Sequence, residues 1–367
     1  MKDANLSQRQ LQGLFLPFLL LGIYLYLLPT QTRAQALNFP TQHAGISIGN
    51  SKVFSGIRFN FRDRDVNKIT GLNFTLWHSN QNKQAQVNGI SVGVLPTAGY
   101  LRGINVGILG VAGEQEVRGL TLGLLGGGSG DKLCGLGIGG LGMGSGGELR
   151  GIFLGGLGVG SGGDIKGIVM GGLGAGAGAN LTGIAVGGLG AGSGGNMSGL
   201  VIAGLGAGAS GDLNGLSIAL LGTGAGEDLK GISIAGLGTG AGKEATGFLF
   251  GGLGAGAGEK LTGIALGGLG AGAPHIEGIA IGGFAAGGFE VQGANLAVGW
   301  VKISDGGYLK GFSMAAFNQI KGDLNGLSLG IFNYTRHLNG IQIGVINYVK
   351  DNPAPFKILP IMNIHFD

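Results

Sequence analysis

Cysteine, proline and charged residues are scarce in this sequence. Its 367 residues include one cysteine, Cys134, and eight prolines, and charged residues make up 11%. A single cysteine forms no internal disulfide, so cystine does not hold the fold together. The few prolines and the lack of a strict three-residue glycine period exclude a collagen. The net charge of +4 is spread along the chain without a basic block, which argues against a nucleic-acid partner.

Glycine and apolar residues are abundant instead. Glycine supplies 87 residues, and hydrophobic residues account for 44% of the chain. A solvated disordered chain is rich in charge and poor in apolar side chains, so this composition predicts a folded protein. Its core must be built from few and small side chains.

The first 36 residues differ from the rest. A polar start with Lys2 and Arg9 precedes the apolar run 14–29, and small residues occupy 34–36. This order predicts a secretory signal peptide over 1–36. The alternative is a membrane anchor, but the run is shorter than the roughly 20 residues of a spanning helix. We therefore expect an exported protein, located at the cell surface or outer membrane of a Gram-negative-type bacterium.

Twenty repeats follow, each beginning with glycine and an apolar residue. The period is 16 residues from Gly103 to Gly263 and looser on either side, which is typical of repeat architectures. The pattern divides the chain into an irregular N-terminal cap at 37–102, glycine- and alanine-rich repeats at 103–292, and C-terminal repeats with a closing strand at 293–367. Each repeat is numbered below from its first glycine, which is place 1.

The pattern within a repeat predicts short strands and two turns. Apolar residues at places 2 and 4, such as Ile152 and Leu154, indicate a strand with one buried face. Glycine, asparagine, aspartate or histidine at place 8 predicts a corner with positive φ, with Pro96 and Ala285 as exceptions. Charges at places 13–16 predict a solvated turn, with the apolar residue at place 15 tucked inward. Cys134 falls at place 16, where we expect it to be exposed.

Such a repeat cannot bury its apolar atoms alone. Parallel coils stacked at about 4.8 Å would bury them together, and twenty coils would form a rod of about 95 Å. The sequence therefore predicts an all-β protein, a β-solenoid of about twenty short coils. An antiparallel outer-membrane β-barrel is the alternative, because 16 residues also accommodate a membrane-crossing strand and a turn. A helical membrane array packed on glycine is a third possibility. Identical successive turns favour the solenoid.

Place 3 changes character along the chain. It is polar near both ends but mostly apolar in the centre. If places 2 and 4 are buried, place 3 faces outward, and a long apolar strip on a soluble protein is normally covered by something. This reasoning predicts a contact face over about 151–282 for a membrane or a second copy, formed by Phe153, Val169, Ala185, Val201, Leu249, Ala265 and Ala280.

Motifs for chemistry are weak. The stretch 236–246 resembles a phosphate-binding loop but has Glu244 after Lys243, where that motif requires serine or threonine. The stretch 127–133 has the wrong spacing for a calcium-binding nonapeptide. The five histidines lie far apart, without metal-ligand spacing. We therefore expect no catalytic residues, no metal, no cofactor and no enzymatic activity.

The least degenerate repeats carry a resemblance. Segments 71–110 and 325–366, the second ending in "LPIMNIHF", resemble the tandem surface-repeat proteins of spirochaetes and Bacteroidota-type bacteria. That family pattern combines a Gly-apolar-x-apolar-Gly phrase, an asparagine and an LPxxNxHF-like tail. The resemblance implies an exported surface or outer-membrane-associated protein and supplies no catalytic residues. We expect a structural or adhesive surface protein, with a barrel acting as pore or anchor as the alternative.

Overall fold

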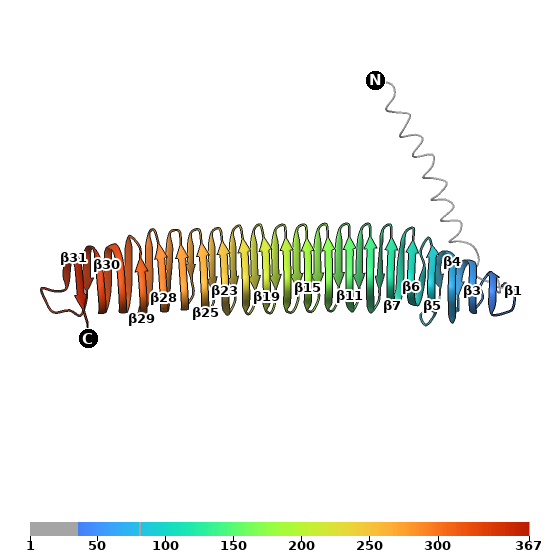
Figure 1. Cartoon of the computed structure of the whole chain (residues 1–367), viewed down its shortest axis with the longest axis horizontal. Coiled ribbons are helices and arrows are strands. Elements are labelled where there is room, and N and C mark those ends of the chain that lie inside the picture. Colours follow the sequence, from blue (N-terminus) through green and yellow to red (C-terminus); the bar gives the residue numbers. More distant parts are fainter. Residues whose placement is uncertain (1–35, 81, 367) are drawn as a thin grey trace, which may run out of the picture.

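The structure is a computed structural model that describes residues 36–80 and 82–366, and it shows a long all-β rod (Figure 1). The rod is a β-solenoid of about 17 turns, slightly fewer than the twenty coils expected. The described residues contain no helix, and therefore none with the length and hydrophobicity of a membrane span. Residues 1–35 of the predicted signal peptide lie outside the described part of the chain.

The ends of the rod are built from longer strands than its centre. The N-terminal strands are β1 (Leu37–Pro40), β2 (Ala44–Ile48), β3 (Val53–Arg64), β4 (Lys68–Asn80), β5 (Gln86–Gly93), β6 (Thr97–Gly107) and β7 (Gly110–Gly123). The C-terminal strands are β28 (Ala285–Ala297), β29 (Trp300–Met314), β30 (Phe317–Val349) and β31 (Ile358–His365). The terminal strands β1 and β31 pair antiparallel with β2 and β30, respectively, so each closes one end of the stack.

Each central coil contributes one long and one short strand. The long strands are β9 (Lys132–Gly139), β11 (Glu148–Gly155), β13 (Ile165–Gly171), β15 (Leu181–Gly187), β17 (Met197–Ala203), β19 (Leu213–Ala219), β21 (Leu229–Ala235), β23 (Glu244–Gly251), β25 (Lys260–Gly267) and β27 (His275–Gly282). The short strands are β8 (Gly126–Ser129), β10 (Gly142–Ser145), β12 (Gly158–Ser161), β14 (Gly174–Ala177), β16 (Gly190–Ser193), β18 (Gly206–Ala209), β20 (Gly222–Ala225), β22 (Gly238–Ala241), β24 (Gly254–Ala257) and β26 (Gly270–Gly272).

Successive coils run in the same direction and in register. Strand β11 pairs parallel with β13, with Gly151 opposite Gly167, and the short strands β12 and β14 pair in the same way. The bends pair as well, since Leu173 N donates to Leu157 O at 2.6 Å. The predicted solenoid is confirmed. The antiparallel alternative is wrong, because sixteen residues complete a full turn and bring each unit back over its predecessor.

A glycine with positive φ begins every repeat. All twenty repeat-starting glycines have φ between 114° and 153°, a region that residues with side chains rarely adopt. A Cβ added to Gly183 would lie 2.0 Å from the carbonyl oxygen of Gly167 in the preceding coil. Backbone conformation and close approach of the next coil together require glycine at place 1. This glycine lies inside the long strand and not at a bend, since Gly151 is within β11 and pairs in register with Gly167.

The predicted corner at place 8 is wrong. The glycines there, such as Gly190, are absent from the positive-φ set of the described residues, and a Cβ on Gly190 would meet its nearest atom at 3.6 Å. The asparagines at this place are buried in a ladder instead. Asn318 Nδ2 donates to Asn333 Oδ1 at 2.8 Å, and Asn333 Nδ2 donates to Asn347 Oδ1 at 2.7 Å. Amide pairing between coils, rather than backbone twist, explains them.

The inward and outward faces of the long strands are the reverse of those predicted. Leu149 at place 15 and Phe153 at place 3 are fully buried, whereas Ile152 at place 2 is 43% exposed. Side chains alternate without interruption from place 15 to place 5, as in any strand, so places 2 and 4 point outward. Near the bend the two sheets approach each other closely. A Cβ on Gly155 at place 5 would lie 2.1 Å from the carbonyl oxygen of Gly158 in the opposite sheet.

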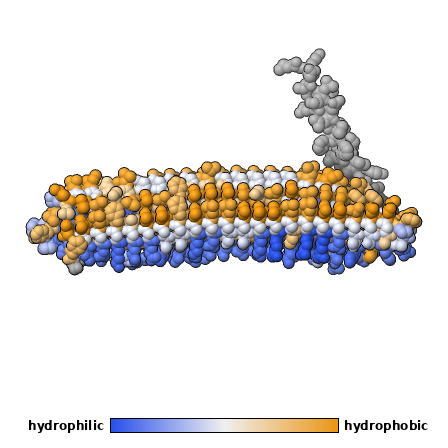
Figure 2. Space-filling view, viewed as in Figure 1, coloured by the Kyte–Doolittle hydropathy of each residue, from blue (hydrophilic) through white to orange (hydrophobic). Residues whose placement is uncertain are grey.

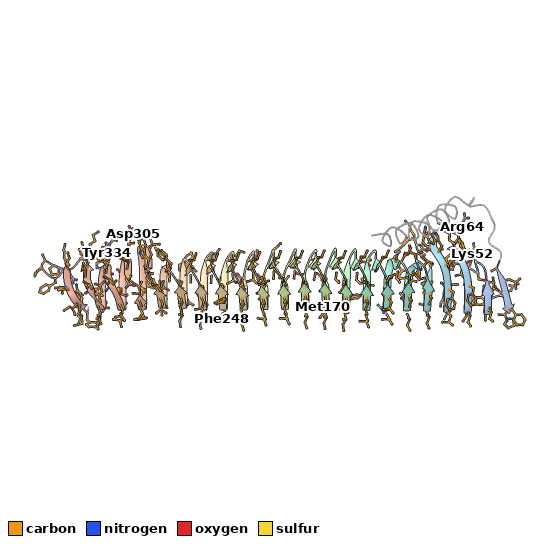
Figure 3. The ribbon with its side chains drawn as sticks, turned by 90° about the horizontal axis from the view of Figure 1, so that it is seen from above. Lys52, Arg64, Met170, Phe248, Asp305 and Tyr334 are labelled. Carbon is orange, nitrogen blue, oxygen red and sulfur yellow. The ribbon has the colours of Figure 1, made fainter. Side chains whose placement is uncertain are left out.

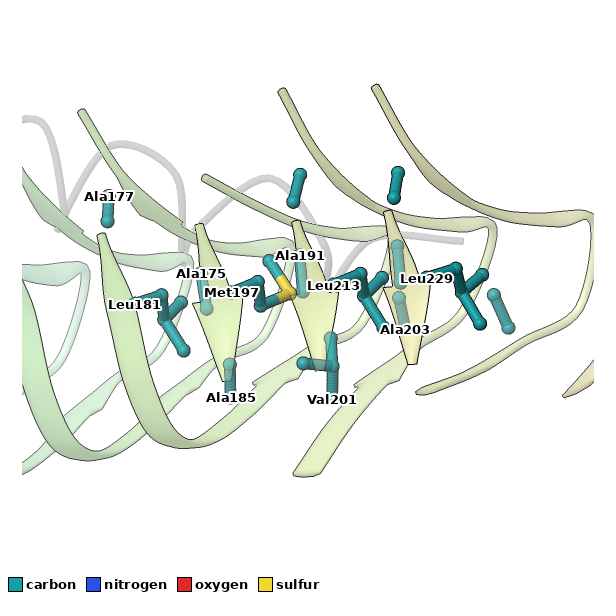
Figure 4. Close-up of a cluster of buried hydrophobic side chains, with 14 of the residues drawn as sticks. Ala175, Ala177, Leu181, Ala185, Ala191, Met197, Val201, Ala203, Leu213 and Leu229 are labelled. Carbon is teal, nitrogen blue, oxygen red and sulfur yellow. The ribbon is translucent and has the colours of Figure 1, made fainter. Parts of the chain in front are cut away.

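The core is a set of ladders between the two sheets. Place 15 contributes its largest aliphatic row, Leu181, Met197, Leu213 and Leu229, all nearly inaccessible to solvent (Figure 4). Facing short strands contribute alanine at place 9, and place 3 contributes residues from alanine to phenylalanine. The core side chains of each coil are covered by the coils on either side of it. Burial is therefore a property of the stack rather than of a single repeat.

Four hydroxyl groups meet inside this core between β19, β21 and the short strands β20 and β22. Ser217 Oγ donates to Ser233 Oγ at 3.0 Å, and Thr223 Oγ1 donates to Thr239 Oγ1 at 2.9 Å. Ser233 Oγ also hydrogen-bonds with both threonine hydroxyls. These four side chains are almost completely buried. Mutual hydrogen bonding allows polar residues to occupy place 3 inside the rod.

We expect Ser233→Ala to lower the free energy of unfolding by about 1–2 kcal/mol, because Thr223 and Thr239 lose a buried partner. The control replaces both serines by alanine and both threonines by valine, which removes donors and acceptors together. Urea denaturation should show a smaller loss per substitution in this quadruple variant. Equal stability of Ser233→Ala and the native chain would show that the cluster is not stabilising.

Candidate binding face

The feature most suited to binding is a continuous apolar surface on the outside of the long-strand sheet. We call it the apolar face, and it consists of the apolar side chains at places 2, 4, 6 and 7. Hydrophobic rows run along the whole rod, with a hydrophilic band along one border (Figure 2). Met170 and Phe248, at places 4 and 2, project from the same side (Figure 3). Its exposed members at places 2 and 4 include Ile104, Leu136, Ile138, Ile152, Met170, Ile202, Ile232, Phe250, Ile264, Ile279, Ile281, Met314 and Ile343.

The corner after each long strand extends this surface. A bend at places 6 and 7 directs a large aliphatic or aromatic side chain outward in coil after coil. Since place 5 is inward and the short strand starts at place 8, the side chain at place 7 has no room inside. The exposed corner residues include Leu109, Leu125, Leu141, Leu157, Leu173, Leu189, Leu205, Leu221, Leu237, Leu253, Leu269, Phe284 and Phe317.

Two grooves are found at the irregular ends of the rod. The N-terminal groove has a volume of about 680 Å³ and is lined by places 4 and 6 of the first coils, including Phe59 and Phe74. Their rings stack with centroids 5.0 Å apart. The C-terminal groove, about 600 Å³, is lined by aromatic residues that include Trp300, Phe332 and Tyr334. The apolar character of the outer surface therefore extends to both ends.

Charged side chains form one border of the apolar face. Place 16 carries a cation in six coils, an acidic residue in one and mostly neutral polar residues in the others; the cations are Arg102, Arg118, Arg150, Lys166, Lys230 and Lys310, and the acidic residue is Glu277. Carboxylates at place 14 pair with them, as Glu148 Oε1 does with Arg150 Nη2 at 2.7 Å and Lys166 Nζ at 3.2 Å. The carboxylate is the less exposed partner in these pairs. Glu116 has a side chain 12% exposed, compared with 64% for Arg118.

Hydrogen bonds keep the carboxylates of this border ionised. The bond from Arg150, together with that from Lys166, holds the pKa of Glu148 below its usual value. Backbone and side-chain hydrogen bonds from Asn180 lower the pKa of Asp164. A carboxyl group with a lowered pKa stabilises the fold above its ordinary pKa, and this contribution is lost as the pH falls through the lowered value. Because the pairs are solvated, each contribution is small.

The contact face predicted at place 3 is wrong as a surface. All seven of its residues lie in the core, with at most 1% exposed: Phe153, Val169, Ala185, Val201, Leu249, Ala265 and Ala280. The polar residues of the same place near the ends are buried too, and Arg58 Nη1 contacts Asp63 Oδ1 at 2.6 Å and Asn73 Oδ1 at 2.8 Å. The long apolar surface that the sequence reasoning sought exists, but it is formed by the neighbouring places 2 and 4.

No group of three potential metal ligands occurs among residues 36–80 and 82–366. His275 and His337 each pair with a carboxylate near the surface, Glu290 and Asp351, respectively. Cys134 is partly exposed, and burial raises the pKa of its thiol. A raised pKa reduces the reactive thiolate fraction at neutral pH. The expectations of no catalytic residue, metal or cofactor stay predictions.

Comparison with known proteins adds no further constraint. No protein-family model, no curated protein and no solved structure matches the chain. The function must therefore be argued from the rod and its surfaces.

Proposed function

We propose that this protein is an exported, non-enzymatic surface element, structural or adhesive, that acts by contact along the apolar face. The continuity of that face over the whole rod is the observation that carries the proposal. Soluble monomers expose apolar patches of a few hundred Å², so a face of this length indicates a covering partner. The apolar run before Ala34–Ala36 and the likeness to surface-repeat proteins support export to a cell surface or outer membrane.

The rest of the rod offers little else for function. Places 8, 10 and 12 of the short-strand side are mostly glycine, so that surface carries almost no side chains. The charged border consists largely of groups that pair with each other. A contact role needs neither a pocket nor a reactive group. It needs a rigid support that holds many apolar side chains in one plane.

The test compares two variants, each with four serine substitutions on one side of the rod. The face variant carries Ile152→Ser, Met170→Ser, Ile202→Ser and Ile232→Ser, all at exposed places 2 and 4. The control carries Gly158→Ser, Gly174→Ser, Gly190→Ser and Gly206→Ser, where a Cβ meets nothing closer than 3.4 Å. Cells producing each protein are fractionated, and intact cells are treated with protease.

We expect the native chain and the control to stay with the cell envelope and to be cleaved on intact cells. The face variant should be released into the medium at least several-fold more, because its apolar contacts are lost. A native chain found in the cytoplasmic fraction contradicts export. Equal envelope retention of the face variant and the control contradicts the contact role.

A further inference from the structure

The two ends of the rod are closed by strands that do not belong to the repeat. β1 and β31 lie at opposite ends (Figure 1) and run antiparallel to the strands they cover, β2 and the last part of β30. All other coils pair in parallel, and such pairing can continue for as long as another coil is supplied. Without β1 and β31, each end would present a row of unpaired backbone groups, which is a template for another chain.

The first and the last coil match each other residue for residue. The sequence is GISI at 45–48 in the first coil and GIQI at 340–343 in the last. Both starting glycines have the positive φ of the repeat, 114° at Gly45 and 153° at Gly340. If Gly340 of one copy lay next to Gly45 of another, isoleucine would lie over isoleucine at places 2 and 4. Equivalent residues meet in this way within the rod, as Ile46 and Ile57 do.

The inward sides of these two coils also fit. Gln342 at place 3 of the last coil is fully buried, but neither polar atom of its amide has a hydrogen-bond partner. The residue at the same place of the first coil is Ser47, which is buried as well. Elsewhere, hydroxyl groups at place 3 of adjacent coils bond to each other, as Ser313 Oγ does to Ser328 Oγ at 2.9 Å. Stacking of the two ends would give the Gln342 amide such a neighbour.

β1 blocks this contact at the N-terminal end. It places Pro40 opposite Gly45. Thr41 N donates to Ala44 O at 3.3 Å, and antiparallel neighbours alternate between bonded and non-bonded pairs, so the backbone of Pro40 faces the free edge. Proline has no N–H to donate there, and the strand has four residues. The edge left at this end is therefore short, reversed in direction and poor in donors.

β31 has the same effect at the C-terminal end. It pairs with β30 from Gly340 to Tyr348, so it covers both strands of the last coil. Its register shifts between Leu359 and Ile361, and this bulge leaves Pro360 unpaired with β30. Prolines and bulges on edge strands are means by which proteins prevent edge-to-edge association. Both ends of the rod carry a proline, although the two strands differ in length and sequence.

We propose that β1 and β31 are terminators, and that the end coils beneath them are complementary surfaces on separate copies of this chain. With both strands in place, the protein is a rod of fixed length. Without them, the last coil of one copy pairs in parallel with the first coil of the next. Each added copy brings a new free end, so this head-to-tail contact grows into filaments of the width of one rod. The inference concerns the ends and is independent of what covers the apolar face.

The experiment removes the end strands from the full chain. The N-edge variant lacks residues 37–42, the C-edge variant lacks residues 351–367, and the double-edge variant lacks both. Electron microscopy gives the length of the particles, and analytical ultracentrifugation gives their mass. Both are measured in a mild detergent, which covers the apolar face and prevents association through it. Circular dichroism compares the β-content of each variant with that of the native chain.

We expect single rods from the native chain and filaments many rods long from the double-edge variant. An equimolar mixture of the N-edge and C-edge variants should stop at a dimer of doubled length, because each pair of molecules offers one free edge of either kind. A double-edge variant that is folded and remains a single rod overturns the proposal. Filaments formed by the native chain also overturn it.

Gly45→Ala in the double-edge variant is the matched control. In the native chain, a Cβ at Gly45 would lie 2.1 Å from Phe39 O and 2.4 Å from Pro40 Cδ, both in β1. Once β1 is removed, this Cβ lies where the backbone of the incoming Gly340 would pack. We expect it to raise the protein concentration needed for filaments at least several-fold while the rod stays folded. Filaments that form equally well with Gly45→Ala would assign the association to another surface.

A second variant keeps every residue, in case a deleted chain fails to fold. It carries Phe39→Pro and Leu359→Pro. The backbone of Phe39 faces β2, because that of Pro40 faces the free edge, and Val349 N donates to Lys357 O at 2.8 Å, so the backbone of Leu359 faces β30. Each substitution removes a hydrogen bond that holds an end strand. We expect the same filaments at several-fold higher concentration, and a folded variant that stays single at every concentration contradicts the proposal.

Discussion

Gly183→Ala is expected to destabilise the rod by at least about 3 kcal/mol. Alanine at φ of 125° is strained by about 1–3 kcal/mol. Its Cβ would also lie 2.0 Å from the carbonyl oxygen of Gly167, and two paired backbones cannot separate at one point without losing hydrogen bonds on either side. Chemical denaturation followed by circular dichroism measures the loss.

Gly190→Ala is the matched control for this substitution. Gly190 lies seven residues further along the same coil, its φ is not in the positive set, and its added Cβ would meet its nearest atom at 3.6 Å. Replacing a glycine whose conformation alanine can adopt stabilises proteins by about 0.4–1 kcal/mol. We expect this variant to be as stable as the native chain or slightly more so. Equal losses at both positions would contradict the assignment of the positive-φ glycine to place 1.

Phe153→Ala is expected to cost about 3–5 kcal/mol, the usual range for a phenylalanine truncated in a core. The Phe153 ring is fully buried and fills the space above Gly137, whose added Cβ would lie 2.6 Å from Phe153 Cδ1. The adjacent Ile152→Ala removes a side chain that is 43% exposed and should cost less than about 1 kcal/mol. Thermal or urea unfolding of the two variants compares them directly.

If Ile152→Ala lowered the free energy of unfolding more than Phe153→Ala, then Ile152 and not Phe153 would point inward. A double variant gives an independent check. Because the Met143 methyl group and the Phe153 ring both occupy the space beside Gly137, Gly137→Ala should be destabilising alone, and Phe153→Ala should remove the part of this loss that comes from the ring. Such coupling is expected only between residues in contact.

The period of the sequence was sufficient to predict the architecture. Equal turns every 16 residues imply equivalent coils, and equivalence is satisfied by parallel stacking but not by antiparallel strands. The place of the positive-φ glycine was not predictable from residue type alone, because glycine occurs at places 1, 8 and 10 with different causes. Within the described part of the chain, only Gly183 and its equivalents combine positive φ with a carbonyl oxygen at about 2 Å from an added Cβ.

The candidate face was predicted to exist but was assigned to the wrong row. Protein interiors are apolar, but an apolar residue need not be in the interior, since much of any protein surface is apolar. The deciding factor here is the alternation of side chains along the strand. Leu149 at place 15 is buried, so Phe153 at place 3 of the same strand also points inward, whereas Ile152 and Leu154 lie on its other side. The polar residues at place 3 suggested solvent, whereas Ser217 and Ser233 are paired through hydrogen bonds between coils.

Exact registration of neighbouring coils also governs how the rod changes length. Gly151 lies over Gly135, and Gly167 lies over Gly151. Removing one complete repeat would therefore bring equivalent residues of the flanking coils together, and contacts of the same types would form between them. Unequal recombination between repeats could therefore shorten or extend the rod in whole steps. Each added or removed repeat would change the area of the apolar face by a fixed amount. The number of repeats would then set the strength of attachment without any change in the sequence of a repeat.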